Sequence, residues 1–239
     1  MQHISKNQIK LVRSLQQKKF RDETGLFVAE GEKCVEELCK AFELVLLVNS
    51  DNATDHDIEQ MSGLRTPQGT IGVFKKRTMP QPSPFVFTKG ESVKLVLDGI
   101  QDPGNLGTII RTADWFGLTD IVCSTDTCDC YNPKVIQATM GSLARVRVHY
   151  ADNLAQTLTN RDKSIPIYGT LLDGKNIYTE ELQTPCIIVM GNEGNGISPE
   201  VRALVTSPVC IPPFREGNHA ESLNVGIATA ITLSEFCRR

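Results

Sequence analysis

The second half of the chain alternates short apolar segments with helix-like segments, and this alternation constrains the fold more than any other feature. Buried strands of parallel sheets read as near-continuous apolar runs, with helices between them. The strand-like runs are VKLVLDGI (93–100), DIVCST (120–125), ARVRVHY (144–150), IPIYGTLL (165–172), CIIVMG (186–191) and VCIPPF (209–214). Helices are expected over 105–116, near 133–140, near 153–161 and from about residue 222. The pattern predicts an α/β fold, with a mostly parallel sheet and helices on both faces.

A proline-rich stretch separates this region from the first part of the chain. Pro80, Pro82 and Pro84 disfavour regular structure and predict a linker. Before them, the chain alternates helix-like and strand-like pieces, with a helix over 30–41, a strand in FELVLLVNS (42–50) and a turn and strand over 66–76. The predicted organisation is a small α/β domain over 1–76, a linker over 77–93 and a main domain over 94–239.

Composition excludes several classes of protein. The 239 residues carry a net charge of −3, and no apolar run is long enough to span a bilayer. The first residues, MQHISKNQIK, lack the apolar core of a secretory signal, so the eight cysteines predict thiols of a cytoplasmic protein. Cys128 and Cys130 form a pair without a second clustered pair. This is a weak zinc signal, and we expect no metal.

Positive charge is concentrated at the N-terminus. Between Met1 and Arg21 there are six basic residues and no acidic one. A helix is predicted there by the apolar residues Ile9, Leu11, Val12 and Leu15. Its charge is either that of a solvated face, as in most charged runs, or that of a surface for RNA phosphates. The expected RNA contacts are Lys6, Lys10, Arg13 and Lys18.

Three predicted strand ends carry unusual residues, at the edge of the sheet where ligands of such folds bind. The stretches are DGIQDPGNLGTIIRTADWFG (98–117), IVMGNEGNGIS (188–198) and IPPFREGNHAESLNVGIATAI (211–231). The first lacks the Lys-Ser/Thr of a nucleotide-triphosphate loop, and its Gly104 and Gly107 do not fit the dinucleotide fingerprint. A dehydrogenase is therefore disfavoured. Taken singly, each stretch is a weak signal, and Gly191, Gly194 and Gly196 are equally well explained as ordinary turn residues.

In this order and spacing, the three stretches resemble the three motifs of the SpoU/TrmH-type branch of the SPOUT methyltransferases. The segment NPKVIQATMGSLARV (132–146) resembles that family's region between its first two motifs, and SKNQIKLVRSLQQKKFRDETGLFVAEGEKCVEE is similar to its small RNA-substrate domain. The resemblance implies a C-terminal trefoil knot, a homodimer formed through the C-terminal domain, and methyl transfer from S-adenosylmethionine to a ribose 2′-hydroxyl of RNA. Ribosomal RNA is favoured over transfer RNA. A non-catalytic RNA-binding protein that kept the fold is the alternative.

The resemblance also assigns a catalytic set, which is Arg111, Asn105, Glu193, Ser222 and Asn224. Arg111 is a poor general base, because the pKa of arginine lies above about 12. We expect its planar fork to grip a phosphate of the target nucleotide, and a surface ion pair with Asp114 or Asp120 is the structural alternative. Ser222 is expected near the start of the last helix, where it could be only an N-cap. Asn224 is expected inside the first turn of that helix, where an asparagine indicates a hydrogen-bonding role.

The donor site implied by the resemblance consists mainly of backbone and apolar groups. Its residues are Gly191, Ile211 and Leu223, with Thr170, Leu171 and Gly196 nearby. A glycine at 191 would allow close approach of backbone, while Ile211 and Leu223 could also be core residues. In the loop over 215–221, Arg215 and His219 either touch RNA or have no role, and we favour the second interpretation.

Overall fold

The computed structural model describes residues 3–238 except 79–84, 86, 88, 89, 215, 216, 218 and 219. Its backbone contacts define two compact units, one of Met1–Thr78 with Asp129–Arg145 and the other of Met79–Cys128 with Val146–Arg239. Much of the predicted linker, as well as Arg215 and His219, lies outside the described residues. The domain boundaries at 76 and 94 stay predictions. Within the described part, no helix is long and apolar enough to cross a membrane.

The first unit is built on a small antiparallel sheet of three strands in the order β1-β3-β2. The strands are β1 (Leu26–Glu30), β2 (Leu44–Val48) and β3 (Ile71–Lys75). Helices of this unit are α1 (Lys6–Ser14), α2 (Lys18–Thr24), α3 (Glu32–Cys39), α4 (Asp55–Met61) and α6 (Pro133–Thr139), and α6 is followed by the 3-10 helix η1 (Ser142–Ala144). One of its cores joins Val12 and Leu15 to the strand residues Val28 and Ile71.

The second unit contains a six-stranded sheet in the order β6-β5-β4-β8-β7-β9, and all of its strand pairs are parallel. Its strands are β4 (Val93–Asp98), β5 (Asp120–Ser124), β6 (Arg147–Ala151), β7 (Ile167–Asn176), β8 (Cys186–Gly191) and β9 (Ser207–Cys210). Its helices are α5 (Pro103–Trp115), α7 (Leu154–Thr159), α8 (Pro199–Arg202) and α9 (Val225–Cys237). The predicted mostly parallel sheet is confirmed, whereas the trefoil knot stays a prediction.

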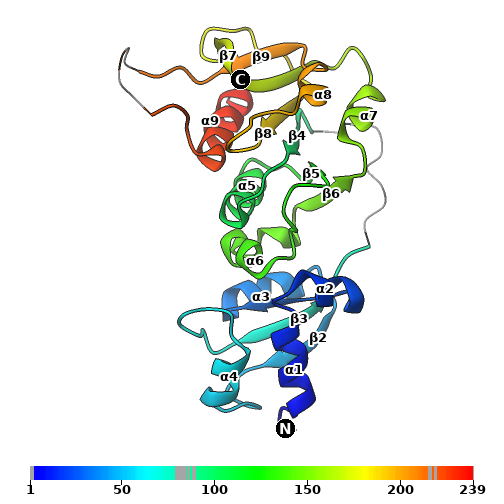
Figure 1. Cartoon of the computed structure of the whole chain (residues 1–239), viewed down its shortest axis with the longest axis vertical. Helices are drawn as coiled ribbons and strands as arrows, with labels where there is room; N and C mark the ends of the chain where they lie inside the picture. The colour runs from blue at the N-terminus through cyan, green and yellow to red at the C-terminus, as the bar shows by residue number, and fades with distance from the viewer. Residues whose placement is uncertain are drawn as a thin grey trace. The chain divides into compact units, whose positions relative to one another are not determined.

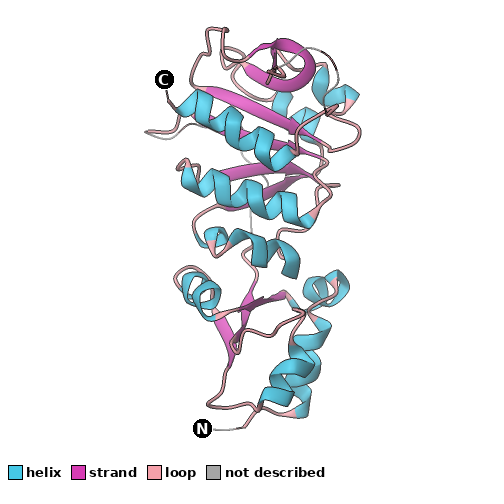
Figure 2. Ribbon diagram, turned by 90° about the vertical axis from the view of Figure 1, so that its left-hand side faces the viewer, coloured by secondary structure: helices cyan, strands magenta, loops and turns pink. Residues whose placement is uncertain are grey.

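Helices cover the six-stranded sheet, as the cyan ribbons around its magenta strands show (Figure 2). The central strands β4 and β8 are buried along their whole length, which explains their continuous apolar sequences. Leu154 and Leu158 of α7 and Val201 of α8 pack in one cluster with strand residues such as Val96 and Val189. Helices α5 and α9 pack against each other, and α9 also contacts β8 (Figure 1).

Two helices begin at different residues from those predicted. Helix α5 begins at Pro103 rather than Asn105, because the Asp102 carboxylate accepts a hydrogen bond from Asn105 N at 2.8 Å and caps the helix. Helix α9 begins at Val225 rather than near residue 222. The predicted N-terminal helix is interrupted after Leu15, so its basic residues are divided between α1 and α2.

Candidate active site

The first two motifs meet at the carboxyl ends of two neighbouring strands. Strands β4 and β8 run in register, with Asp98 opposite Gly191, so the turns that follow them lie side by side. Two side chains join these turns. The Asp98 carboxylate accepts a hydrogen bond from Ser198 N at 2.7 Å, and Asn192 Nδ2 donates to Gly99 O at 2.7 Å. Asn192 Oδ1 also accepts from the backbone N–H groups of the two residues after Glu193, which fixes the shape of that turn.

Three of the five predicted catalytic residues form a continuous chain of hydrogen bonds. Asn105 Nδ2 donates to Glu193 Oε1 at 2.9 Å, and Asn224 Nδ2 donates to Asn105 Oδ1 at 2.8 Å. The chain therefore contains one residue from each motif. The Glu193 carboxylate also faces the N–H groups of Gln101 and Asp102, at 3.4 Å each. The carboxylate is exposed and anchors the start of α5, and it can still accept further hydrogen bonds.

Asn224 is the N-cap of α9, and this corrects the predicted roles of two residues. Its Oδ1 accepts hydrogen bonds from Gly226 N at 3.0 Å and Ile227 N at 3.3 Å, while its Nδ2 reaches Asn105. The prediction that Asn224 lies inside the first turn was wrong, although the hydrogen-bonding role that it indicated is present. Ser222 precedes the cap and is exposed, so the alternative that it is the N-cap was also wrong.

Arg111 lies on α5 with its side chain exposed. Among the residues that the structure describes, none forms a hydrogen bond or ion pair with its guanidinium. Asp120, one of the two alternative partners, is bound instead by Arg147 and His149, at 2.6 and 2.7 Å. Burial by itself would raise the pKa of Asp120, but hydrogen bonds from these two residues outweigh it and hold that pKa well below its usual range. The structure thus gives no support to an ion pair as the role of Arg111.

The predicted donor-site residues lie in or after three neighbouring strands, β8, β7 and β9. Gly191 ends β8, and a Cβ there would clash with the backbone of Gly196 and Ile197, so the expected close approach of backbone occurs within the loop itself. Gly196 has φ +70° and open space around it. Thr170 Oγ1 donates to Val189 O at 3.2 Å, which ties β7 to β8.

The remaining donor-site residues are apolar and only partly covered. Leu171 and Ile211 are half-buried, and Leu223 is 49% exposed. Leu223 is therefore not a core residue, which was its structural alternative. Backbone groups with a few apolar side chains suit a neutral adenosine moiety, and such a site avoids strong solvation of a sulfonium. No group of three or more metal-binding side chains occurs within the described ranges.

The predicted RNA-binding residues differ in their surroundings. Lys6, Lys10 and Arg13 are exposed and follow one stripe of α1, since they are four and three residues apart. The buried Val12 and Leu15 fix the opposite side of the helix. Lys18 belongs to α2 and forms an exposed ion pair with Asp22 at 2.5 Å. The basic stripe is thus clearest on α1.

Sequence reasoning missed the residues that hold the motifs in place. Asp98 and Asn192 join the first two motifs, and Asp102 caps α5. A buried aspartate at the end of an apolar strand is a signal that could have identified Asp98. An asparagine before Glu193 in a glycine-rich turn could have identified Asn192, because asparagine side chains often bind nearby backbone groups in turns.

Comparison with known proteins places this geometry in one family. A family model described as the SpoU rRNA Methylase family matches residues 92–234, and one described as an MRM3-like substrate binding domain matches residues 6–69. The Bacillus subtilis (strain 168) protein named 23S rRNA (guanosine(2553)-2'-O)-methyltransferase RlmP is 31% identical, with 95% of each chain covered. The SpoU rRNA Methylase model matches more than half of the chain, so the chain belongs to the SpoU rRNA methylase family.

Solved structures agree with this family. A TrmH-family protein from Porphyromonas gingivalis is 39% identical, with a TM-score of 0.85 and 98% of each chain covered. An rRNA methyltransferase from Sinorhizobium meliloti, solved with S-adenosylmethionine bound, is 30% identical with a TM-score of 0.85, over 100% of this chain and 97% of the other. The predicted family is confirmed, and with it the enzyme class, an RNA methyltransferase that uses S-adenosylmethionine.

Proposed function

We propose that this protein transfers a methyl group from S-adenosylmethionine to a ribose 2′-hydroxyl of ribosomal RNA. The observation that carries the proposal is the hydrogen-bonded chain of Glu193, Asn105 and Asn224. Asn105 lies on α5, the helix that also bears Arg111, whose guanidinium has no partner among the described residues. The choice of ribosomal RNA is supported by the B. subtilis relative, whose name specifies 23S rRNA and a 2'-O-methyl guanosine. Transfer RNA is the alternative substrate.

The donor would be held by the loops after β8 and β9 and by the middle of β7. Backbone groups of Gly191 and Gly196 would bind its polar edges, and Ile211, Leu223 and Leu171 would contact its apolar surface, with Thr170 nearby. When bound, the donor supplies an electrophilic methyl group. The protein must then hold the ribose oxygen in line with that group and receive the hydroxyl proton.

Arg111 is assigned to the substrate phosphate. Its exposed fork can donate two parallel hydrogen bonds to a phosphate, which orients the adjoining ribose. The Glu193 carboxylate is the better proton acceptor, because its oxygens carry lone pairs that can accept a proton, whereas a guanidinium is a donor only. Asn105 binds Glu193 through its Nδ2 and Asn224 through its Oδ1, so we assign it a positioning role. Ser222 is exposed and precedes Asn224 closely in the sequence, and we keep it as a member of the site.

Substrate binding is assigned to the first unit. The stripe of Lys6, Lys10 and Arg13 would contact RNA phosphates, and Lys18 would add to it when it is released from Asp22.

We also propose a homodimer formed through the C-terminal domain and a cytoplasmic location. For the dimer, support comes from apolar side chains that remain uncovered on α9 and α5, where Ile227 is 52% and Trp115 86% exposed. A single-subunit mass by light scattering at micromolar concentration would contradict the dimer.

A map of ribose methylation tests the proposed substrate. We expect one 2′-O-methyl position of 23S rRNA to disappear in a strain that lacks the gene and to return when the gene is restored. Restoration with the Arg111→Ala variant should fail. If the lost position lies in a transfer RNA, the choice of substrate is wrong. If no ribose methylation changes, the proposed reaction is wrong.

A further inference from the structure

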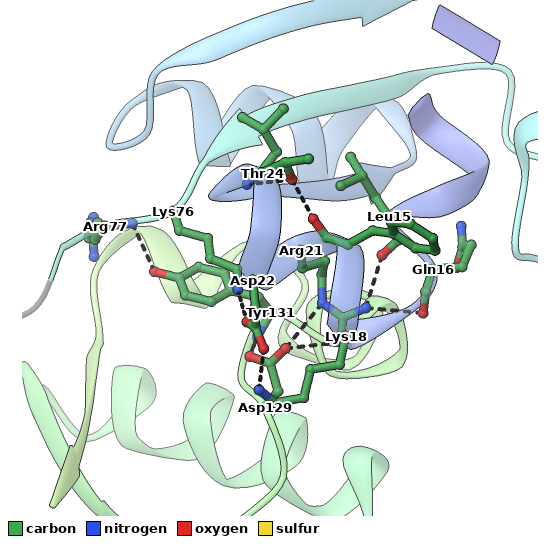
Figure 3. A network of polar contacts seen from close by, with 12 residues as sticks. Leu15, Gln16, Lys18, Arg21, Asp22, Thr24, Lys76, Arg77, Asp129 and Tyr131 are labelled. Atoms are coloured by element: carbon green, nitrogen blue, oxygen red, sulfur yellow. Dashed lines mark hydrogen bonds and ion pairs between the residues drawn. The ribbon is translucent and has the colours of Figure 1, made fainter. Parts of the chain in front are cut away.

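One arginine of the basic N-terminal segment is withdrawn from solvent. Arg21, on α2, is 1% exposed, and its Nε and Nη2 atoms donate to Asp129 Oδ2 at 3.1 and 2.9 Å (Figure 3). Its Nη1 donates to the backbone oxygens of Leu15 and Gln16, at 2.9 and 3.0 Å. Asp129 Oδ1 accepts a hydrogen bond from Tyr131 N at 2.9 Å. Arg21 therefore binds inside the protein, and Asp129 uses both of its oxygens.

Asp129 begins the segment 129–145, which lies within the SpoU methylase match at 92–234 but packs in the first unit. The Tyr131 ring lies 4.8 Å from that of Phe27, and its hydroxyl accepts a hydrogen bond from Arg77 N at 3.1 Å. Further along, Arg77 Nη2 donates to Ala144 O at 2.9 Å, and Gly141 packs so closely on α3 that a Cβ would meet Glu37. The substrate-binding unit therefore includes a piece of the methylase sequence.

Directly before Asp129, the chain supports the turn of the first motif. Cys128 N donates to Ile100 O at 2.8 Å, and Thr127 Oγ1 accepts from Ile100 N at 3.2 Å. Ser124 Oγ accepts from Gly99 N at 2.8 Å. The turn at 99–102 leads into α5, which carries Asn105 and Arg111. Asp129, which Arg21 binds, is thus joined by a single peptide bond to Cys128, which binds the turn at 99–102.

We propose that Arg21 and Asp129 are positioning residues for methyl transfer. Arg21 holds Asp129, and the peptide bond between Asp129 and Cys128 passes this restraint on to Cys128. Cys128 in turn holds Ile100 by a hydrogen bond, and Ile100 belongs to the turn that leads into α5. The proposal rests on the assignment of α5 in the proposed function. It predicts an effect on the rate of transfer, because small displacements of reacting groups slow a reaction strongly. It predicts little effect on RNA affinity, because the guanidinium is not available to phosphates.

The test compares the full-length chain with Arg21→Gln, using S-adenosylmethionine and 23S rRNA transcribed in vitro. Rates are divided by the number of S-adenosylhomocysteine sites measured by calorimetry, so that only folded protein is counted. We expect kcat to fall about ten- to hundredfold, while the KM for RNA stays within about twofold. Hydrogen exchange at the Cys128 amide should become faster, since its bond to Ile100 O is loosened. Arg21→Lys should restore kcat in part, because one ammonium can reach Asp129 but cannot make every contact of the fork.

Two further variants keep the test decisive. Arg145→Gln is the matched control, since it removes an exposed ion pair with Glu37 in the same segment and should leave kcat unchanged. If a lone buried carboxylate prevents Arg21→Gln from folding, the double variant Arg21→Met/Asp129→Asn removes both buried charges and should still show the fall in kcat. Wild-type kcat in either folded variant overturns the proposal. Full transfer by Arg111→Ala would instead show that the assignment of α5 is wrong, whatever the result at Arg21.

Discussion

Asn105 and Arg111 lie on the same helix but are used in different ways. Both ends of the Asn105 amide are already bound within the protein, by Glu193 and Asn224. The Arg111 guanidinium has no partner among the described residues and is exposed. A side chain whose donor and acceptor are both bound within the protein can hold other groups in place, whereas an unbound donor fork is suited to bind substrate. The two residues should therefore fail in different ways when replaced.

Replacing Arg111 should slow transfer strongly, with little effect on either binding step. We expect Arg111→Ala to lower kcat about a hundredfold or more, because the ribose is no longer oriented. S-adenosylhomocysteine affinity should stay unchanged, and RNA affinity should change little. Arg111→Lys should not rescue the rate, since it keeps the charge but loses the two-pronged contact. Full activity of Arg111→Lys in a methyl-transfer assay would show that charge alone matters there.

Replacing Asn224 should destabilise α9 as well as the site. Asn224→Ala removes an N-cap and should lower the free energy of unfolding by about 1 kcal/mol, as measured by urea denaturation. Ser222→Ala is the matched control and should change it by less than about 0.5 kcal/mol, because its side chain is exposed and caps nothing. The reverse order of the two effects would contradict the observed cap.

At the scale of secondary-structure elements, α1 is the expected RNA contact. Changing Lys6, Lys10 and Arg13 together to glutamine should weaken binding of every RNA sequence and reduce the slope of log affinity against log salt by about 0.7 per lost contact. Lys18→Gln should have a smaller effect, because that lysine is already paired with Asp22. Donor affinity is the internal control and should not change. An unchanged salt slope in the triple variant would make the stripe an ordinary solvated face.

The edge of the sheet formed by β5 and β6 should contribute to acid sensitivity. The pKa of Asp120 is lowered in the folded protein, so the unfolded chain binds the proton more tightly. The resulting stability is present above the ordinary aspartate pKa of about 3.9 and is lost as the pH falls below it. The free energy of unfolding of Asp120→Asn should therefore decline less steeply with falling pH than that of the wild type. Equal slopes in urea unfolding at several acidic pH values would contradict this.

The elements could be predicted from the sequence wherever burial fixes the pattern. The runs around β4 and β8 are apolar because both faces of those strands are covered, and their order along the chain gave the parallel sheet. The starts of α5 and α9 were predicted wrongly, because they depend on single side chains, Asp102 and Asn224. The bonds among Asn105, Glu193 and Asn224 join residues about a hundred positions apart, and spacing alone does not specify such contacts.

For the whole molecule, the segment 129–145 changes what an isolated methylase domain should do. A fragment of 94–239 keeps all three motifs, and the sequence alone predicts that it binds the donor if it folds. In the full chain, however, Tyr131 packs on Phe27, and Asp129 is paired with Arg21. Without residues 1–78 these groups lose their partners, so the fragment should melt at a lower temperature than the full chain. An equal melting temperature by calorimetry would show that the segment is stable without the first unit.

The reaction itself can be measured with the purified protein, methyl-labelled S-adenosylmethionine and 23S rRNA transcribed in vitro. After digestion of the RNA to nucleosides, the label is assigned by mass spectrometry to the ribose or to the base. We expect the label in a single 2′-O-methyl nucleoside, and little or no label with Arg111→Ala. Label on a base, or no label with a protein that binds S-adenosylhomocysteine and RNA, would contradict it.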